Sequence, residues 1–202
     1  MIKNIIFDMG NVLLRFDRDY FLDAIGVKPE DKCVLMNNVY LSLEWARMDR
    51  GSMTEAEAAE SMCRRLPERL HEQAHLLVDR WDRPILPVPG MTDIVKSLKE
   101  AGYGVYLLSN ASFRQHEYWP RVPGSEYFDG TLISADVKLV KPCAEIYELL
   151  YAKFGLMPDE CLFIDDSAAN VEGAERTGMP GIVFHGSAGE LRDEMRRFGV
   201  KI

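Results

Sequence analysis

The stretch IKNIIFDMGNVLL, residues 2–14, decides the fold class of this chain. It opens with a short apolar run rich in β-branched residues, which is typical of a strand buried on both faces of a parallel sheet. The run ends on a charged residue, Asp8, and a glycine, Gly10, comes two positions later. Taken alone, Asp8 would be interpreted as a turn residue or a helix-capping acid. Its meaning therefore depends on the residues found at the ends of the other strands.

The same apolar pattern recurs along the chain and alternates with helical patterns. Strand-like runs occur in GYGVYLLSN, GTLISADV, CLFIDD and PGIVF, at residues 102–110, 130–137, 161–166 and 180–184. Between them, helical spacing is found in TDIVKSLKEAG, AEIYELLYAKFG and SAANVEGAERTG, at residues 92–102, 144–155 and 167–178. This alternation predicts the α/β class, with a Rossmann-like parallel sheet that carries helices on both faces.

One long segment interrupts the alternation, between the first strand and the helical pattern at 92–102. It contains no convincing strand, and residues 33–48, CVLMNNVYLSLEWARM, have helical spacing. A capping box, in which Thr54 is followed three residues later by Glu57, marks the start of a further helix. The segment is therefore expected to be all-helical.

A proline-rich connector, RPILPVPG at residues 83–90, closes this segment. We expect a helical cap subdomain at 16–85, inserted into a core made of 1–15 and 86–202. An insert placed directly after the first strand would sit over the C-terminal end of that strand. In open α/β sheets, ligands bind at that end.

Composition narrows the possible partners. The chain has 202 residues, 47% of them hydrophobic, and a formal net charge of -8 without a basic stripe, which argues against nucleic acid. The N-terminus does not resemble a signal peptide, and no apolar stretch approaches membrane length. The four cysteines are scattered without a C-x-x-C pair. We expect a cytoplasmic protein without a membrane partner, either a monomer or a homodimer.

Polar residues stand at the ends of several of the predicted strands. The residues at these ends are Asp8, Ser109, Asn110, Asp165 and Asp166, with Lys141 on a neighbouring loop. If the strands are parallel, these residues converge on one edge of the sheet. Three carboxylates in one cleft repel each other unless a cation joins them, and an all-oxygen ligand set suits Mg²⁺. The hydroxyl, amide and ammonium groups fit phosphate oxygens, so the inventory predicts a phosphoryl-transfer site.

These motifs resemble those of the haloacid dehalogenase-like (HAD) hydrolase superfamily. The resemblance rests on FDMGN, LSN, KLVKP and FIDDSAAN, in this order and with a helical insert after the first motif, over residues 4–185. FDMGN, LSN, the pair Trp119–Pro120 and FIDDSAANVEGA also resemble bacterial sugar-phosphatase members related to the N-terminal domain of epoxide hydrolase. The resemblance implies an α/β core with a helical cap and a Mg²⁺-dependent phosphatase activity.

The resemblance also implies a role for each motif residue. Asp8 would attack phosphorus and form an aspartyl-phosphate. Mg²⁺ would be bound by the Asp8 carboxylate, the Gly10 carbonyl oxygen and Asp166, with Asp165 bound directly or through water. Asn170 is expected either to hold this acidic loop or to cap a helix.

The remaining motif residues would serve the substrate. Ser109 and Asn110 would hold the phosphoryl oxygens, and Lys141 would neutralise charge on the nucleophile and the phosphate. Trp45 is the residue of the insert that we expect to face substrate, with packing inside the cap as the alternative. The expected substrate is a small phosphorylated metabolite, with a sugar phosphate such as a sugar 1-phosphate as the finer expectation.

Gly10 departs from the family pattern, because most phosphatases of this superfamily have an aspartate there as general acid and base. Loss of a general acid typically costs about 10²–10⁴-fold in rate. One explanation is that another group supplies the proton, with Asp17, Asp19, His116 and the substrate itself as candidates. A second is a good leaving group, such as the anomeric oxygen of a sugar 1-phosphate. A third is that the site binds without catalysing.

Two alternative functions remain open. One is a metal-independent 2-haloacid dehalogenase, which also uses an aspartate nucleophile and also lacks the second aspartate. Such an enzyme has no need of the paired acids Asp165 and Asp166, which therefore favour a phosphatase. The other is a non-catalytic protein that binds phosphate or a partner at a degenerate site.

Overall fold

A parallel sheet of five strands forms the centre of the computed structural model, which describes residues 1–202. The strands are β1 (Asn4–Phe7), β2 (Gly104–Ser109), β3 (Gly130–Ile133), β4 (Cys161–Asp165) and β5 (Gly181–Val183). Their order is β3-β2-β1-β4-β5, and every neighbouring pair is parallel. The predicted α/β class with a Rossmann-like sheet is confirmed.

The register of the central strands brings their C-terminal ends to one edge. Phe7 of β1 pairs with Leu107 of β2 and with Ile164 of β4. The next residues along β1 and β4 are Asp8 and Asp165, so these two carboxylates emerge together. The alignment of the strands thus gathers polar side chains at one edge of the sheet.

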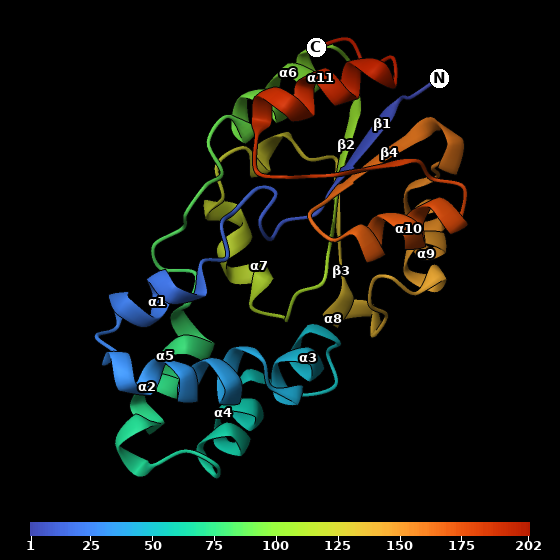
Figure 1. The fold of residues 1–202 in the computed structure, drawn as a ribbon. Coiled ribbons are helices and arrows are strands. Elements are labelled where there is room, and N and C mark those ends of the chain that lie inside the picture. Colours follow the sequence, from blue (N-terminus) through green and yellow to red (C-terminus); the bar gives the residue numbers. More distant parts are fainter.

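Helices cover both faces of the sheet (Figure 1). The longer ones are α6 (Met91–Glu100), α9 (Ala144–Phe154), α10 (Ala168–Arg176) and α11 (Ala188–Arg197). Side chains alternate along β1, so that Ile5 and Phe7 pack in the cluster that contains α6 and α11 residues, whereas Ile6 packs in the cluster of α9 and α10. The full burial of all three explains why this strand is apolar throughout.

The third strand is shorter than the run GTLISADV suggests. It ends at Ile133, and Ser134–Val137 form a short helix, α8. The Ser134 hydroxyl accepts a hydrogen bond from the Ala111 N–H and donates to the Asp49 carbonyl. These two contacts to distant parts of the chain hold the Ser134 side chain at the start of α8. A further short helix, α7 (Gln115–Tyr118), comes after β2.

The segment between β1 and α6 is helical, as expected. Its helices are α1 (Arg18–Ala24), α2 (Pro29–Leu35), α3 (Leu43–Asp49), α4 (Glu55–Cys63) and α5 (His71–Arg80), with a π-helical turn at Met36–Tyr40. We call residues Arg18–Arg80 the helical segment. The capping box of Thr54 and Glu57 is present. The pattern at 33–48 is divided, because Ser42 caps a new helix by accepting the Trp45 N–H.

The helical segment has a hydrophobic cluster of its own and lies at the opposite end of the molecule from both termini (Figure 1). The chain enters and leaves it through two linkers that pair side by side. The Arg15 N–H donates to the Leu86 carbonyl at 2.8 Å, and the Val88 N–H donates to the Leu13 carbonyl at 2.9 Å. The division of the chain into a core of 1–15 and 86–202 and a cap of 16–85 stays a prediction.

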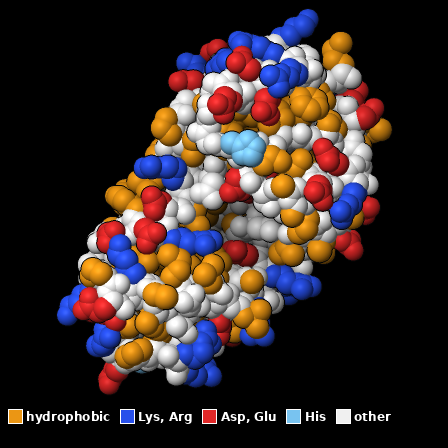
Figure 2. All heavy atoms as spheres, in the orientation of Figure 1, with side chains coloured by type: hydrophobic (Ala, Val, Ile, Leu, Met, Phe, Trp, Pro, Cys, Tyr) orange, Lys and Arg blue, Asp and Glu red, His pale blue; other side chains and the backbone are white.

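The surface carries both signs of charge. Acidic and basic side chains are interspersed over the face shown in Figure 2. None of the helices has the length and apolar character that crossing a membrane requires. The four cysteines, Cys33, Cys63, Cys143 and Cys161, are free thiols.

Candidate active site

A cavity of about 240 Å³ lies between the C-terminal edge of the sheet and the helical segment. Two walls of different character enclose it. The sheet wall includes Asp8, Gly10, Ser109, Lys141 and Asp166. The helical wall includes Trp45, Met48, Asp49, Glu55 and Val78.

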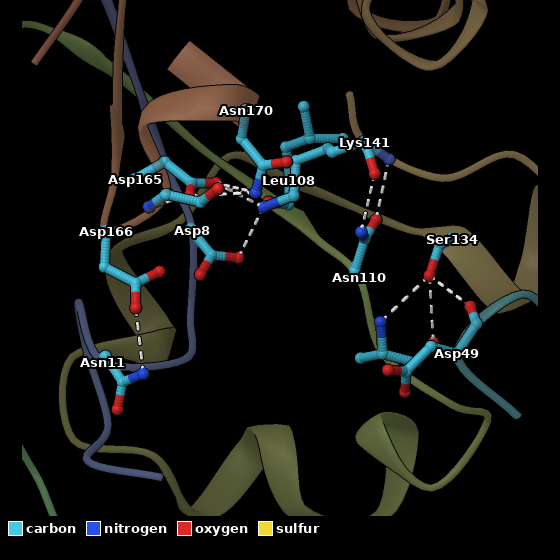
Figure 3. A network of polar contacts seen from close by, with 12 residues as sticks. Asp8, Asn11, Asp49, Leu108, Asn110, Ser134, Lys141, Asp165, Asp166 and Asn170 are labelled. Carbon is cyan, nitrogen blue, oxygen red and sulfur yellow. Dashed lines mark hydrogen bonds and ion pairs between the residues drawn. The ribbon is translucent and has the colours of Figure 1, made fainter. Parts of the chain in front are cut away.

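Lys141 is the centre of the sheet wall (Figure 3). Its Nζ donates to Asp8 Oδ1 at 2.6 Å, to Asp165 Oδ2 at 2.7 Å and to the Leu108 carbonyl at 2.9 Å. All three N–H groups of the ammonium are thus used. Burial disfavours the charge on Lys141, but the two carboxylates outweigh burial and raise the pKa of Lys141. The residue stays a cation inside the protein and ties β1, β2 and β4 together.

Asp8 is the carboxylate of this network that faces the cavity. It is 7% exposed, and its Oδ1 accepts the Lys141 ammonium. The pKa of Asp8 is raised to about 7, mainly by burial. The charge of Lys141 lowers this pKa, and the charge of Asp165 raises it further. Its Oδ2 makes no hydrogen bond within the protein and is available to a ligand.

Asp165 is wholly buried behind Asp8 and does not line the cavity. Its Oδ1 accepts the Ser167 N–H at 2.8 Å, and the Asn170 side-chain amide lies 3.0 Å from Oδ1 and 3.1 Å from Oδ2. With Lys141, these donors satisfy both carboxylate oxygens. Asn170 therefore holds the acidic loop, the first of the two expectations for this residue.

Asp166 is exposed and lies at the mouth of the sheet wall. Its Oδ2 accepts the Asn11 side-chain amide at 2.9 Å. Asn11 has a left-handed backbone, with φ 55°, and its Oδ1 accepts the Phe16 N–H at 3.0 Å. Sequence reasoning did not single out Asn11, although it belongs to the FDMGN motif.

Asp8, Asp165 and Asp166 form a cluster of three carboxylates, of which Asp165 is already occupied by protein donors. One carboxylate oxygen from each lies within 4.8 Å of the others. Asp8 Oδ2 and an oxygen of Asp166 are free of protein donors, and Gly10 adds a backbone carbonyl on the same wall. An all-oxygen donor set with few protein ligands suits Mg²⁺.

Ser109 and Asn110 both line the cavity, but only the Asn110 side chain is hydrogen-bonded within the protein. The Ser109 hydroxyl makes no hydrogen bond within the protein, so it can serve a ligand. The Asn110 amide instead donates to the Lys141 carbonyl at 3.0 Å and accepts the Lys141 N–H at 2.9 Å. The structure thus gives the Asn110 side chain a role in positioning the Lys141 loop.

The helical wall is aromatic. Phe16 packs on Trp81 and Trp45, with ring centroids 5.0 Å and 5.7 Å apart, and Trp81 packs on Tyr118 at 5.0 Å. All four rings line the cavity, together with Arg18, which lies 5.4 Å above the Phe16 ring. Trp45 therefore lines the cavity and also packs inside the helical segment, and its contact with substrate stays a prediction.

Two acids on the helical wall were not anticipated from the sequence. Glu55 Oε1 accepts the Arg114 N–H at 3.2 Å, whereas the Asp49 carboxyl makes no hydrogen bond within the protein. Burial, and then the charges of Asp8 and Glu55, raise the pKa of Asp49 to about 8. No motif identified these residues, because only the fold brings the end of α3 to the sheet.

The three side chains considered as replacement acids lie elsewhere. Asp17 caps α1 by accepting the Tyr20 N–H, Asp19 is exposed, and His116 lies 3.0 Å from Asp136. None of them lines the cavity. Trp119 is also outside it and packs on Phe128.

Fold and site together define a hydrolase of one family. The model of the haloacid dehalogenase-like hydrolase family matches residues 2–178, so the chain belongs to that family. The resemblance found in the sequence motifs is confirmed.

Two curated relatives illustrate the range of this family. A D-ribitol-5-phosphate phosphatase of Bacteroides thetaiotaomicron is 27% identical over 192 residues, which cover 89% of this chain and 90% of the relative. A drimenol cyclase of Aspergillus calidoustus is 25% identical over 201 residues, which cover 98% of this chain. The match spans only 36% of that cyclase, so the present chain corresponds to one part of it.

Solved structures have the same fold. A predicted HAD-like family hydrolase from Porphyromonas gingivalis superposes with a TM-score of 0.73 and 26% identity, and 100% of each chain is covered. A HAD family enzyme of Bacteroides thetaiotaomicron, in complex with magnesium and inorganic phosphate, has a TM-score of 0.71 and 24% identity. That match covers 93% of this chain and 96% of the other.

Proposed function

We propose that this protein is a Mg²⁺-dependent phosphatase that hydrolyses a small phosphorylated metabolite through an aspartyl-phosphate on Asp8. The observation that carries the proposal is the Lys141 network, in which one buried ammonium binds both Asp8 and Asp165 beside a third carboxylate. A carboxylate held by a cation and aimed into a cavity suits nucleophilic attack on phosphorus. The phosphatase name of one relative supports the same reaction class.

The metal would be held by Asp8, the Gly10 carbonyl and Asp166. Asp165 is already satisfied by protein donors, so its part is to orient Lys141 and the acidic loop. When bound, Mg²⁺ would supply positive charge against the phosphoryl oxygens and remove the repulsion among the carboxylates. The magnesium and phosphate bound by the Bacteroides structure support this assignment.

The other residues of the cavity would each have a separate role in the reaction. Lys141 offsets negative charge as the Asp8 carboxylate approaches a phosphate dianion, because its ammonium lies 2.6 Å from the nucleophile. The free Ser109 hydroxyl can donate to a phosphoryl oxygen, while Asn110 holds the Lys141 backbone in place. The helical wall would cover the leaving group and exclude water.

The cavity wall bears on the substrate. The rings of Phe16, Trp45 and Trp81 line this side of the cavity together with Arg18 and with Tyr118 of α7. This surface suits a compact leaving group with an apolar face and at least one polar group. Sugars present such C–H faces to aromatic rings. A sugar phosphate, including a sugar 1-phosphate, fits this surface and remains the finer part of the proposal.

Two other functions make different demands on the site. A metal-independent dehalogenase has no use for a third carboxylate beside Asp8 and Asp165, so Asp166 favours the phosphatase. A non-catalytic phosphate-binding protein would keep the same cavity without turnover.

Phosphate release from a panel of monoesters, including sugar 1-phosphates and 6-phosphates, tests the proposal. We expect release that requires Mg²⁺, stops with chelator and falls below detection in Asp8→Asn. Asp19→Asn is the matched control, because Asp19 is an exposed acid outside the cavity. Turnover that persists in Asp8→Asn, or halide release from 2-haloacids without metal, would refute the proposed function.

A further inference from the structure

The sheet wall has no side chain placed as a general acid for a departing alcohol, because Asp8 is the proposed nucleophile, Asp166 a proposed metal ligand and Ser109 a proposed phosphoryl contact. Gly10 has no side chain, and a Cβ placed there would meet only Asp8 Oδ2, at 3.8 Å. Lys141 already uses its three N–H groups on Asp8, Asp165 and Leu108. A leaving group on this side therefore faces open space rather than an acid.

Asp49 lies on the opposite wall of the same cavity, as the last residue of α3. Its carbonyl accepts a hydrogen bond from the Ser134 hydroxyl, which anchors the end of α3 to the chain after β3. Figure 3 shows Asp49 beside Ser134, across the opening from Asp166. The helical segment thus delivers one carboxyl to the open side of the site.

The turn after Asp49 is pressed against the core. Gly51 has a φ of +70°, and a Cβ there would lie 2.1 Å from the Ala135 carbonyl oxygen of α8. Only glycine tolerates both the backbone conformation and the close approach. Two independent contacts, at Ser134 and at Gly51, therefore fix the position of Asp49 relative to the sheet.

The surroundings of Asp49 favour the neutral form of its carboxyl. Burial, Asp8 and Glu55 raise the pKa of this group to about 8. The neighbouring Tyr118 phenol also has a raised pKa, mainly through burial and then through Asp49. Helix α8, which packs on α3, carries Asp136, whose carboxylate lies 3.0 Å from His116 Nε2. A neutral carboxyl with no protein partner is suited to donate a proton.

We propose that Asp49 is the general acid and base of this phosphatase, supplied by the helical segment in place of the side chain that Gly10 lacks. The inference rests on the proposed function.

Both half-reactions balance in atoms and electrons. In the first, Asp8 forms a bond to phosphorus, the phosphorus–oxygen bond to the leaving group breaks, and the leaving oxygen takes the proton of Asp49. In the second, a water oxygen bonds to phosphorus, the Asp8–phosphorus bond breaks, and Asp49 takes one proton from that water. Asp49 is then protonated again, and alcohol and inorganic phosphate are the products.

A pair of esters with different leaving groups tests the assignment. Asp49→Asn should lower kcat/KM on an alkyl phosphate by about 10²–10⁴-fold, since an alkoxide needs a proton. On p-nitrophenyl phosphate, whose leaving group departs as an anion, the first half-reaction should change by less than about tenfold. If the role of Asp49 were merely structural, kcat/KM would fall by the same factor on both esters.

Two further readouts sharpen the test. After p-nitrophenyl phosphate is added and the reaction is quenched in acid, Asp49→Asn should accumulate the phosphoryl adduct on Asp8, visible by intact mass. The adduct accumulates because the water of the second step has lost its base. In the Asp49→Asn background, Gly10→Asp should raise kcat/KM on the alkyl phosphate at least about tenfold above that of Asp49→Asn alone. We expect this gain because the space at Gly10 is open. Asp19→Asn should behave as wild type.

The outcomes separate the two proposals. Equal losses on both esters, without an accumulated adduct, would overturn the role of Asp49 and leave the phosphatase standing. A wild-type protein that lacks Mg²⁺-dependent and Asp8-dependent release from every ester would overturn the proposed function and the role of Asp49 with it.

Discussion

The two walls of the cavity are built by different means. The sheet wall is a connected set of short hydrogen bonds around Lys141, held by strands whose ends are in register. The helical wall consists of aromatic rings packed edge to face and of the carboxyl of Asp49, which makes no hydrogen bond within the protein. The sheet wall is a polar network that leaves Asp8 Oδ2 and the Ser109 hydroxyl free for a ligand, whereas the other wall is mainly apolar.

This difference indicates a division of labour. Groups that must be placed within tenths of an ångström lie on strand ends, where backbone pairing fixes them. Groups that must fit a variable leaving group lie on an insert, whose side chains can change without disturbing the sheet. Single substitutions can therefore perturb one wall at a time.

The largest effect is expected from Lys141→Met. The change leaves Asp8 and Asp165 buried without a counter-charge, which should cost about 3–5 kcal/mol of stability. Activity should fall by more than about 10³-fold, because charge on the nucleophile and phosphate is no longer offset. Urea unfolding and phosphate release measure both effects.

Lys96→Met serves as the control, because Lys96 is a surface residue whose only ion pair, with Glu100, is long and exposed. It should change stability by less than about 0.5 kcal/mol. A Lys141→Met protein as stable as wild type would mean that the sheet wall does not depend on its central cation.

The next effect concerns the helical wall alone. Trp45→Ala removes one ring from the cavity, and KM for a bulky ester should rise about tenfold, equivalent to roughly 1.4 kcal/mol of binding. Inhibition by inorganic phosphate should stay unchanged, since phosphate would contact only the sheet wall. Steady-state kinetics with and without phosphate measure the two constants separately.

Trp45→Phe keeps a ring in the wall and should restore most of the lost affinity. If phosphate inhibition weakens together with ester binding in Trp45→Ala, the two walls do not act independently.

The contrast between the walls also explains how much the sequence could predict. The residues of the sheet wall could be predicted from the sequence, because parallel strands bring their C-terminal ends together. Asp8, Lys141 and Asp165 could therefore be grouped from the order and pattern of the motifs alone. The contact between Asn110 and Lys141 could not, since side-chain hydrogen bonds depend on loop conformation. Asp49 was missed for a stronger reason, because its place depends on how α3 packs on α8 rather than on any local motif.

A smaller effect is expected on stability, and it depends on pH. The folded protein raises the pKa of Asp49 to about 8, whereas in the unfolded chain it is about 3.9. Between these values the folded state holds the extra proton, so stability falls as pH rises. Asp49→Asn removes the cost of burying the charged carboxylate and should stabilise the metal-free protein by about 1–2 kcal/mol near pH 8. This value is smaller than the full pKa shift of Asp49 implies, because the carboxyl faces a solvated cavity.

Thermal unfolding at pH 4 and pH 8 in chelator measures the difference. The gain in melting temperature should be present at pH 8 and largely vanish at pH 4, close to the unfolded pKa, where the folded and unfolded states differ little in bound protons. An equal gain at the two pH values would show that packing, not charge, is responsible.

The smallest effect lies inside the helical segment, away from the cavity. Glu44 accepts two hydrogen bonds from Arg65, at 2.6 and 2.8 Å, and one from Ser61 at 2.8 Å. The Arg65 hydrogen bonds, opposed by burial and aided by Ser61, lower the pKa of Glu44 to about 2. Since the folded pKa is depressed, the pair contributes stability above the unfolded value of about 4.3 and loses it as pH falls toward 2.

Glu44→Gln should therefore cost about 1 kcal/mol at pH 6, a modest value because the Arg65 side chain is 43% exposed. The cost should shrink toward zero by pH 2, where wild-type Glu44 is itself becoming protonated.

Glu60→Gln, an exposed acid on the same helix α4 as Ser61, is the control without such a pH dependence. Chemical unfolding monitored by tryptophan fluorescence measures both variants, because Trp45 and Trp81 lie in or beside the helical segment. A cost that stays constant from pH 6 to pH 2 would mean that Glu44 stabilises the helical segment by its shape and its hydrogen bonds and not by its charge.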